Sequence, residues 1–273
     1  MIVFNVFFII IALIIVALFL LAALVAYYST PEKKGQLGES RIYDDLAQIS
    51  ENHAVITNCY LPKPNGGTTE IDLILIHESG VYVIESKNYN GWIFGSEDQQ
   101  YWTQSFRGSH GSSQKFRFYN PLQQNKNHIH CLKSILRDRS IPYYSYIVFG
   151  NNCELKDIHL TSDFHHIVYS RFLLKEISLH AQSIGRCLTD EQIRHIYDQL
   201  LPFTQVTSEQ KDQHIASVQK KQLPVVQPDG TWRCPLCGGT LVQRAAKRSS
   251  YAESIFWGCS NYPRCHFIYQ PHK

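Results

Sequence analysis

The chain has 273 residues, 44% of them hydrophobic and 18% charged, with a formal net charge of +3. Its 16 tyrosines, 14 phenylalanines and 4 tryptophans can supply a hydrophobic core, which excludes a wholly disordered chain. One long uncharged segment lies at the N-terminus, and no second run approaches its length, which excludes a membrane protein with several spans. The length fits one mid-sized domain and a smaller one.

The N-terminal segment, residues 2–28, contains no charged residue and, apart from Asn5, only apolar ones. As a helix it would be about 40 Å long, more than the roughly 30 Å hydrocarbon core of a bilayer. We therefore expect a transmembrane anchor over residues 1–30. Lys33 and Lys34 follow it and no charge precedes it, so the positive-inside rule predicts a single-pass protein whose soluble body lies in the cytoplasm.

After this segment, residues 31–203 are expected to form an α/β domain. Apolar residues at helical intervals predict a helix over 35–50. Two β-rich runs, 70–79 and 80–89, meet at Ser79-Gly80 and predict a hairpin. The other expected elements are a strand at 54–61, short strands with a long loop at 91–119, a helix at 120–139, strands at 143–150 and 165–170, and a helix at 188–200 capped by Thr189 and Gln192.

The two runs of the predicted hairpin carry acidic and basic residues in an apolar setting. Glu85 and Lys87 are two residues apart and share a face, and Asp72 can lie near them on the facing strand. Two adjacent carboxylates are costly without a cation between them, and hard oxygen ligands select Mg²⁺ or Mn²⁺. For so short a pattern, however, ordinary ion pairs at a strand edge are the commoner explanation.

Four motifs follow one another along residues 35–124, and together they are more specific than the hairpin pattern. They are Gly35-x-x-Gly38-Glu39, Glu70-x-Asp72, Gly80-Val81-x-x-Ile84-Glu85-Ser86-Lys87 and Asn120-Pro121-x-x-Gln124. In this order they resemble the nuclease-related domain, a family of the PD-(D/E)XK restriction-endonuclease-like fold. The resemblance implies a mixed-sheet α/β core and hydrolysis of phosphodiester bonds by metal-activated water. Position 71 is Ile, where the superfamily name has Pro.

The resemblance also implies roles for residues at the matching positions. Asp72 and Glu85 would bind Mg²⁺ or Mn²⁺, with the backbone carbonyl of Ser86 as a further ligand. Lys87 would orient the attacking water. The full catalytic set implied in this way is Glu39, Asp72, Glu85, Lys87 and Gln124.

Two members of this set are expected to act around the metal. Glu39 would add to the metal or water shell, and Gln124 would steady the site or a phosphate. For Glu70, a hydrogen bond within the fold is favoured over a direct role in catalysis. Enzymes of this fold that cut both strands of a duplex often pair, so a homodimer is a further expectation from the resemblance.

Residues 231–273 are expected to form a small zinc module, joined to the first domain by a polar linker at 204–230. Its candidate ligands are two cysteine pairs, Cys234 with Cys237 and Cys259 with Cys265. Two pairs separated by β-prone sequence suit tetrahedral zinc, and so small a module needs the metal to fold. The alternative is four unrelated cysteines. The other cysteines stand singly, as in a reducing compartment: Cys59, Cys131, Cys153 and Cys187.

The stretches CPLCGG and FWGCSNYPRC closely resemble the zinc ribbon at the C-terminus of bacterial type I DNA topoisomerases. In that family such ribbons bind single-stranded DNA, which makes nucleic acid an expected partner here. Residues 205–273 hold nine Lys or Arg against four Asp or Glu, which favours contact with a polyanion. The residues expected to contact nucleic acid are Arg233, Arg244, Lys247, Arg248, Trp257, Tyr262 and Arg264.

The sequence therefore predicts a membrane-anchored, Mg²⁺-dependent nuclease acting on nucleic acid, with DNA the expected substrate, and a Zn²⁺ ribbon that binds nucleic acid. The main alternative is a non-catalytic protein that uses the same fold and ribbon to hold DNA at the membrane. A third interpretation gives the ribbon a protein partner. Binding that weakens steeply with salt would favour nucleic acid over that third interpretation.

Overall fold

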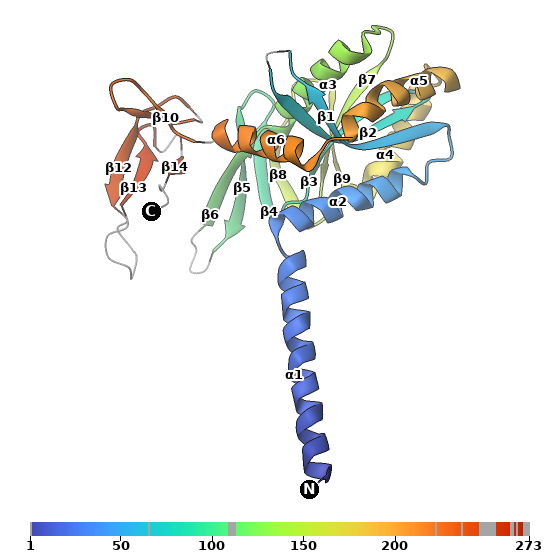
Figure 1. The fold of residues 1–273 in the computed structure, drawn as a ribbon. Coiled ribbons are helices and arrows are strands. Elements are labelled where there is room, and N and C mark those ends of the chain that lie inside the picture. Colours follow the sequence, from blue (N-terminus) through green and yellow to red (C-terminus); the bar gives the residue numbers. More distant parts are fainter. Residues whose placement is uncertain are drawn as a thin grey trace. The chain divides into compact units, whose positions relative to one another are not determined.

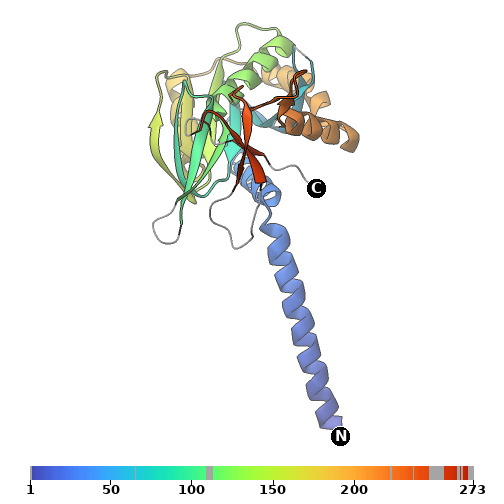
Figure 2. The same ribbon diagram turned by 90° about the vertical axis from the view of Figure 1, so that its left-hand side faces the viewer.

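The computed structural model describes residues 2–64, 66–108, 113–221, 223–235, 237–245, 255–262, 265 and 267–269 (Figures 1 and 2). The chain divides into two compact units. The first, here called the N-terminal unit, comprises Met1–Pro64 and Thr69–Thr204. The second, the C-terminal unit, comprises Asn65–Thr68 and Gln205–Lys273.

The N-terminal unit begins with two helices, α1 (Ile2–Tyr28) and α2 (Pro31–Leu46). Within the part of the chain that is described, no single helix is long and apolar enough to cross a membrane. The helices Leu13–Tyr28 and Glu32–Leu46, which meet at a bend of 72°, reach the required length and hydropathy only when they are taken together. The prediction of a single membrane-spanning helix is therefore not supported.

A five-stranded mixed sheet forms the centre of this unit, in the order β1-β2-β3-β7-β9. β2 and β3 form the predicted antiparallel hairpin, in which His77 pairs with Gly80, and β3, β7 and β9 run parallel to one another. The mixed α/β class predicted from the sequence is confirmed. The bounds are β1 (His53–Pro62), β2 (Thr68–His77), β3 (Gly80–Lys87), β7 (Tyr143–Phe149) and β9 (His165–Tyr169).

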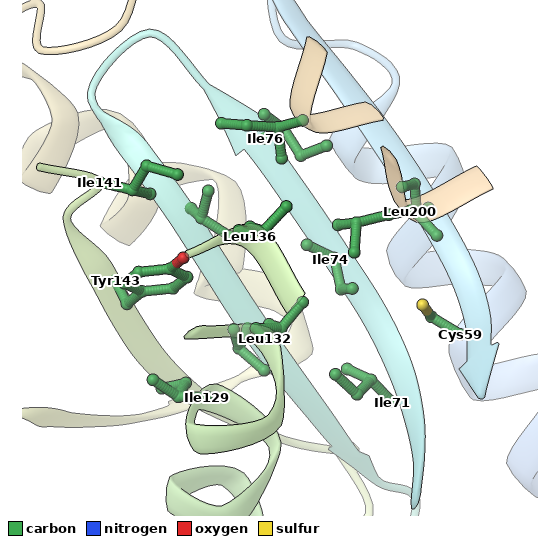
Figure 3. Close-up of a cluster of buried hydrophobic side chains, with 14 of the residues drawn as sticks. Cys59, Ile71, Ile74, Ile76, Ile129, Leu132, Leu136, Ile141, Tyr143 and Leu200 are labelled. Atoms are coloured by element: carbon green, nitrogen blue, oxygen red, sulfur yellow. The ribbon is translucent and has the colours of Figure 1, made fainter. Parts of the chain in front are cut away.

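Helices pack on both faces of this sheet. On one face, Ile71, Ile74 and Ile76 of β2 belong to a buried cluster with α3 (Pro121–Leu136) and α5 (Asp190–Leu200) (Figure 3). On the other face, alternate residues of the same strands pack against α2 and α4 (Leu173–Ile184). Because both faces are covered, β2 and β3 read as nearly continuous apolar runs.

A second, four-stranded sheet has the order β6-β5-β4-β8. Its buried Ile93 and Trp102 pack with Leu122 and Phe149, so one face of this sheet forms part of a third buried cluster. The sequence predicted short strands in this region but did not predict β8. The bounds are β4 (Gly91–Ser96), β5 (Tyr101–Arg107), β6 (Ser113–Tyr119) and β8 (Cys153–His159), and the 3₁₀ helices of the unit are η2 (Ser170–Phe172) and η3 (Leu201–Thr204).

The local signals for helix ends are confirmed. Asn120 caps α3 and Pro121 occupies its first turn, while Thr189 and Gln192 form the predicted capping box of α5. The predicted first helix is shifted, since α2 begins at Pro31 after the cap Thr30. In this start, the Thr30 hydroxyl accepts a hydrogen bond from the Lys33 N–H, one of the N–H groups that a helix start leaves without a partner.

The C-terminal unit contains a helix and short strands. The polar stretch expected as a linker contains α6 (Ser208–Lys221). Its strands are β10 (Val225–Val226), β11 (Trp232–Arg233), β12 (Leu241–Ala245), β13 (Ile255–Cys259) and β14 (Ile268–Tyr269), of which β12, β13 and β14 form an antiparallel three-stranded sheet.

Candidate active site and zinc centre

Asp72 lies where β2 and β3 separate. The ladder between them runs from the pair Leu73–Ile84 to the pair His77–Gly80, so Asp72 is just beyond its last rung. There the Asp72 carboxylate accepts a hydrogen bond from the backbone N–H of Ser86, with 2.8 Å between Oδ2 and N. A side chain thus takes the position that a backbone carbonyl would have in a continued ladder, and this fixes the carboxylate at the end of β3.

Glu85 and Lys87 share one face of β3, as alternation predicts, and that face is turned to α3. The Lys87 ammonium donates a hydrogen bond to Glu85 Oε1 and lies 3.4 Å from Oε1 of Gln124. Nδ1 of His128 is 3.6 Å from Oε2 of Glu85, and only 1% of the Glu85 side chain is exposed. The strand and the helix therefore hold a buried acid beside a half-buried base.

The second oxygen of Glu85 fits a cation ligand. Among the residues that the structure describes, Oε2 of Glu85 has no hydrogen-bond partner, although it is buried. An unpaired buried carboxylate oxygen is costly, and a divalent cation would relieve that cost. In the described part of the chain, no cluster of three side-chain ligands forms around Asp72 and Glu85. Mg²⁺ bound there would complete its shell with backbone or water oxygens, as it commonly does.

Glu39 reaches the site from α2, which lies close to the end of β3. The Asn88 side chain donates a hydrogen bond to the Lys34 carbonyl over 2.6 Å and so ties α2 to the residue after Lys87. A Cβ atom added at Gly38 would lie 3.2 Å from Cβ of Asn88. The glycine therefore permits this close packing, and the half-buried Glu39 is next to it in the chain.

Burial and mutual repulsion shift the pKa values of the acids. Burial, with the charge of Glu85 in addition, raises the pKa of Asp72 to about 8, against the opposing effect of Lys87. Burial and the charge of Asp72 raise the pKa of Glu39 to about 7. Burial likewise raises the pKa of Glu85, while the adjacent ammonium opposes that shift. The site is thus short of positive charge, and a divalent cation would supply it.

Two contacts at this site were missed from the sequence. Tyr60 on β1 donates a hydrogen bond to Oε1 of Glu70 over 2.6 Å, so Glu70 does hydrogen-bond as expected, but its partner was not foreseen. The sequence also did not predict that His128 of α3 is buried beside Glu85. A sequence signal existed, because His128 follows Gln124 by four residues and therefore lies on the same face of α3.

The four predicted zinc ligands come together. The Sγ atoms all lie within 4.8 Å of one another in Cys234, Cys237, Cys259 and Cys265. The Sγ–Sγ distances are 3.7 Å for Cys234 and Cys265 and 3.3 Å for Cys237 and Cys259. Tetrahedral zinc with Zn–S bonds of about 2.3 Å places its sulfurs roughly 3.8 Å apart, so the set fits Zn²⁺.

Backbone turns hold these cysteines. Gly238 donates its N–H to the carbonyl of Cys234 over 2.9 Å and has φ of 70°, a conformation that glycine adopts without strain. The Asn261 N–H points to Sγ of Cys259 over 3.4 Å. Burial raises the pKa of Cys237, but hydrogen bonds to its sulfur, first from the Gly239 N–H, outweigh that effect and lower it to about 7. Such N–H donors stabilise thiolates, the form that binds zinc.

The residues expected to contact nucleic acid divide into three groups. Arg233 and Tyr262 are exposed, and the Arg244 guanidinium lies 5.5 Å from the centre of the Tyr262 ring. Trp257 stacks on Trp232 with 4.8 Å between ring centres and belongs to the buried cluster of the unit. The remaining three, Lys247, Arg248 and Arg264, lie outside the described residues.

Comparison with known proteins agrees with both halves of this geometry. Residues 34–150 match the nuclease-related domain, and residues 232–273 match the topoisomerase DNA-binding C4 zinc finger. An uncharacterized protein of Bacillus anthracis is 32% identical over 193 residues, which cover 70% of this chain and 86% of that protein. The chain belongs to the same family as that protein. No solved structure matches the chain.

The matched nuclease-related domain includes all five residues expected to be catalytic: Glu39, Asp72, Glu85, Lys87 and Gln124. The structure brings Glu85, Lys87 and Gln124 into direct contact, and Asp72 and Glu39 interact electrostatically with that group. The two resemblances stated from sequence motifs are confirmed, while the chemical roles of these residues stay predictions.

We expect Mg²⁺ affinity to increase between about pH 6 and pH 8, because the cation competes with protons held by Asp72 and Glu39. Each displaced proton contributes up to about a tenfold gain per pH unit. The raised pKa values mean that the folded state binds protons more tightly than the unfolded chain does. The metal-free protein should therefore lose stability as pH rises from about 4 to about 8, between the ordinary pKa values of these acids and their raised ones. Calorimetric titration and thermal melts measure both effects, and an affinity independent of pH would contradict this assignment.

Removal of zinc should unfold the C-terminal unit and leave the N-terminal unit folded. We expect about one zinc ion per chain by elemental analysis, lost in Cys259→Ser and retained in Cys187→Ser, an exposed cysteine outside the cluster. Limited proteolysis after chelation should then cut within residues 205–273 only. Equal zinc content in both variants would show that these four cysteines do not form the site.

Proposed function

We propose that this protein is a metal-dependent nuclease that hydrolyses phosphodiester bonds, with DNA as its expected substrate. The observation that carries the proposal is the pair of carboxylates at the end of β3, half-buried Asp72 and buried Glu85, with Lys87 beside them and no hydrogen-bond partner for Oε2 of Glu85 among the described residues. A structural ion pair needs only one carboxylate for one lysine. The second carboxylate, from Asp72, and Oε2 of Glu85 are additional oxygen ligands of the kind that a divalent cation requires.

Each residue then has a definite task. Asp72, Glu85 and the Ser86 carbonyl would hold Mg²⁺ or Mn²⁺, which activates water and stabilises charge on the phosphate. The Lys87 ammonium carries three donors, and those not used by Glu85 and Gln124 are available to a water or a phosphate oxygen. Gln124 orients the ammonium, and Glu39 adds negative charge near the metal. The reaction needs no covalent intermediate.

The alternative is a protein that binds DNA without cutting it. In that case Lys87 and Glu85 form a closed ion pair, and nucleic acid is held by other surfaces, including the zinc ribbon. The raised pKa values of Asp72 and Glu39 argue against this alternative, because a purely structural pair gains nothing from two further acids that are hard to ionise.

Catalysis is tested with Asp72→Asn and Lys87→Met in the full chain with zinc retained. We expect each to lower cleavage of plasmid and single-stranded DNA by about 10²-fold or more, since both remove charge at the reacting phosphate. Asp44→Asn and Lys126→Met are matched controls, because both side chains are exposed on neighbouring helices. Binding without cleavage in the parent protein would favour the tethering alternative, and cleavage that survives both variants would place the reaction elsewhere.

We also propose that the N-terminal segment attaches the protein to a membrane, with residues 31–273 on the cytoplasmic side. Residues 2–28 carry no charge, and the side chains of Leu13–Tyr28 are exposed, including Phe19 at 75%. Exposed apolar surface of this size is costly in water and favourable in a bilayer. The basic residues that follow agree with the proposed orientation.

Membrane attachment predicts that the full chain sediments with membranes and resists extraction by alkaline carbonate. Phe19→Arg should weaken this, because a charge at the centre of a membrane helix costs about 3 kcal/mol. Leu37→Arg, on an exposed position of α2, is the control. A thiol reagent that cannot cross the membrane should reach the exposed Cys187 only after permeabilisation. Recovery of the parent chain in the supernatant would contradict attachment.

A further inference from the structure

The second sheet has a face that the first three clusters do not use. Side chains alternate along β4 and β5, and Ile93 and Trp102 point to the buried side. Trp92 and Phe94 must then lie on the opposite side, and neither belongs to any buried cluster formed by the described residues. Both are half-buried, so parts of their rings remain accessible.

Pairing extends this face across β5 and β6. Phe94 pairs with Thr103, which pairs with Arg117, so the three side chains form a row on one side of the sheet. Tyr101 and Tyr119 form a second pair on that side, with ring centres 6.0 Å apart. Four aromatic rings therefore share the face.

Positive charge lines the same face at its β6 edge. Arg107, Lys115 and Arg117 are exposed and alternate on that side, and β5 and β6 contain no acidic residue. Lys115 and Arg117 are about 6.8 Å apart along the strand. At the opposite edge, Lys156 of β8 pairs with Glu154 and lies 5.6 Å from the centre of the Trp92 ring, so the positive charge without an acidic partner is on the β5–β6 side.

This face is connected to the candidate active site through α3. β6 ends at Tyr119, and Asn120 begins α3. The Tyr119 hydroxyl donates a hydrogen bond to Oε1 of Gln123 over 3.4 Å, and the next residue, Gln124, contacts Lys87. On the hidden side of the same hairpin, Gln104 donates to the carbonyl of Asn90, three residues after Lys87. The hairpin is thus anchored to both elements that form the catalytic site.

We propose that this face, defined by Trp92, Phe94, Tyr101, Arg107, Lys115, Arg117 and Tyr119, binds single-stranded nucleic acid and leads it to Lys87. The inference rests on the proposed nuclease function and specifies its substrate. Cations on an exposed strand neutralise phosphates, while aromatic rings stack on bases. Only an unpaired strand offers base faces to such rings, because those of a duplex are stacked on each other.

Edge strands also carry lysine and arginine for another reason, since charges there prevent pairing with a second chain. That explanation accounts for Lys115 and Arg117 but not for aromatic rings on the inner strands of the same face. It also predicts a different result on mutation, namely self-association without loss of nucleic-acid binding.

The test measures binding of a fluorescent single-stranded oligonucleotide to the full zinc-loaded chain. Asp72→Asn is present throughout, so that cleavage does not interfere. We expect Lys115→Gln with Arg117→Gln to weaken binding about tenfold and to reduce the slope of log affinity against log salt by about 1.4, the value for two phosphate contacts on a single strand. Lys175→Gln with Arg194→Gln removes the same charge from exposed positions on α4 and α5 and should change neither quantity.

Stacking is tested separately at Tyr119. Tyr119→Phe keeps the ring and should bind nearly as well as the parent, whereas Tyr119→Leu should bind several-fold more weakly. Duplex DNA should be less affected by Tyr119→Leu than single-stranded DNA. Unchanged binding in the Lys115 and Arg117 variant, or an equal loss for duplex, would overturn the assignment. Self-association of that variant with intact binding would also overturn it, in favour of edge protection.

Failure of this inference and failure of the nuclease proposal give different results. If the face does not bind a single strand, the parent still cleaves DNA and the face variants cleave it at the parent's rate. If the protein is not a nuclease, the parent does not cleave, while the binding loss in the face variants is still measured in full.

Discussion

A buried glutamate and the half-buried lysine paired with it, at the open end of β3, are the constraint on which the rest of the N-terminal unit depends. Neither charge is tolerated alone in such a place, and each lowers the cost of burying the other. β3 supplies both from one face, and α3 covers them with Gln124 and His128. The Glu85–Lys87 ion pair is stable only if β3 and α3 keep their relative position. The ion pair therefore depends on the packing of α3 against the sheet, and it favours that packing in turn.

The neighbouring elements are arranged so that this end of the sheet stays open to other charged groups. Loss of pairing beyond Leu73 releases Asp72 from the ladder, and its carboxylate then binds the Ser86 N–H. Asn88 lies between two glycines: a Cβ at Gly150 would come within 2.5 Å of its Oδ1, and one at Gly38 within 3.2 Å of its Cβ. Small residues on both sides thus bring α2, with Glu39, over the same point.

Much of this could be predicted from the sequence because the signals are local. Alternation on a hairpin placed Glu85 and Lys87 on one face, and cap residues located α3 and α5. Asp72 is different, since its contact depends on where two strands stop pairing, which alternation does not reveal. The partnership of Tyr60 with Glu70 joins β1 to β2 by a side-chain bond, and no periodic pattern encodes it.

Non-local pairing explains the larger omissions as well. β8 is adjacent to β4 although about 60 residues separate them in the chain, and its polar sequence has little strand signal of its own. The aromatic face of the second sheet exists only once β4, β5 and β6 are in register. From the sequence alone, Trp92, Phe94 and Tyr101 are ordinary candidates for the hydrophobic core. In the fold, the buried Trp102 fills the space over Gly95 on one side of the sheet, and these three residues lie on the other side.

The two proposed nucleic-acid contacts of this chain obey different chemistry and therefore need not be redundant. The ribbon has four soft thiolates that suit zinc, whereas the sheet face needs no metal and the carboxylates of the candidate active site favour a hard cation. When two weak sites share a chain, binding at one raises the effective concentration of nucleic acid at the other. A strand held by the ribbon would then be presented repeatedly to the sheet face and the site beside it. Under that arrangement, affinity can be supplied mainly by the ribbon, and the sheet face can remain weak enough to release cleaved product.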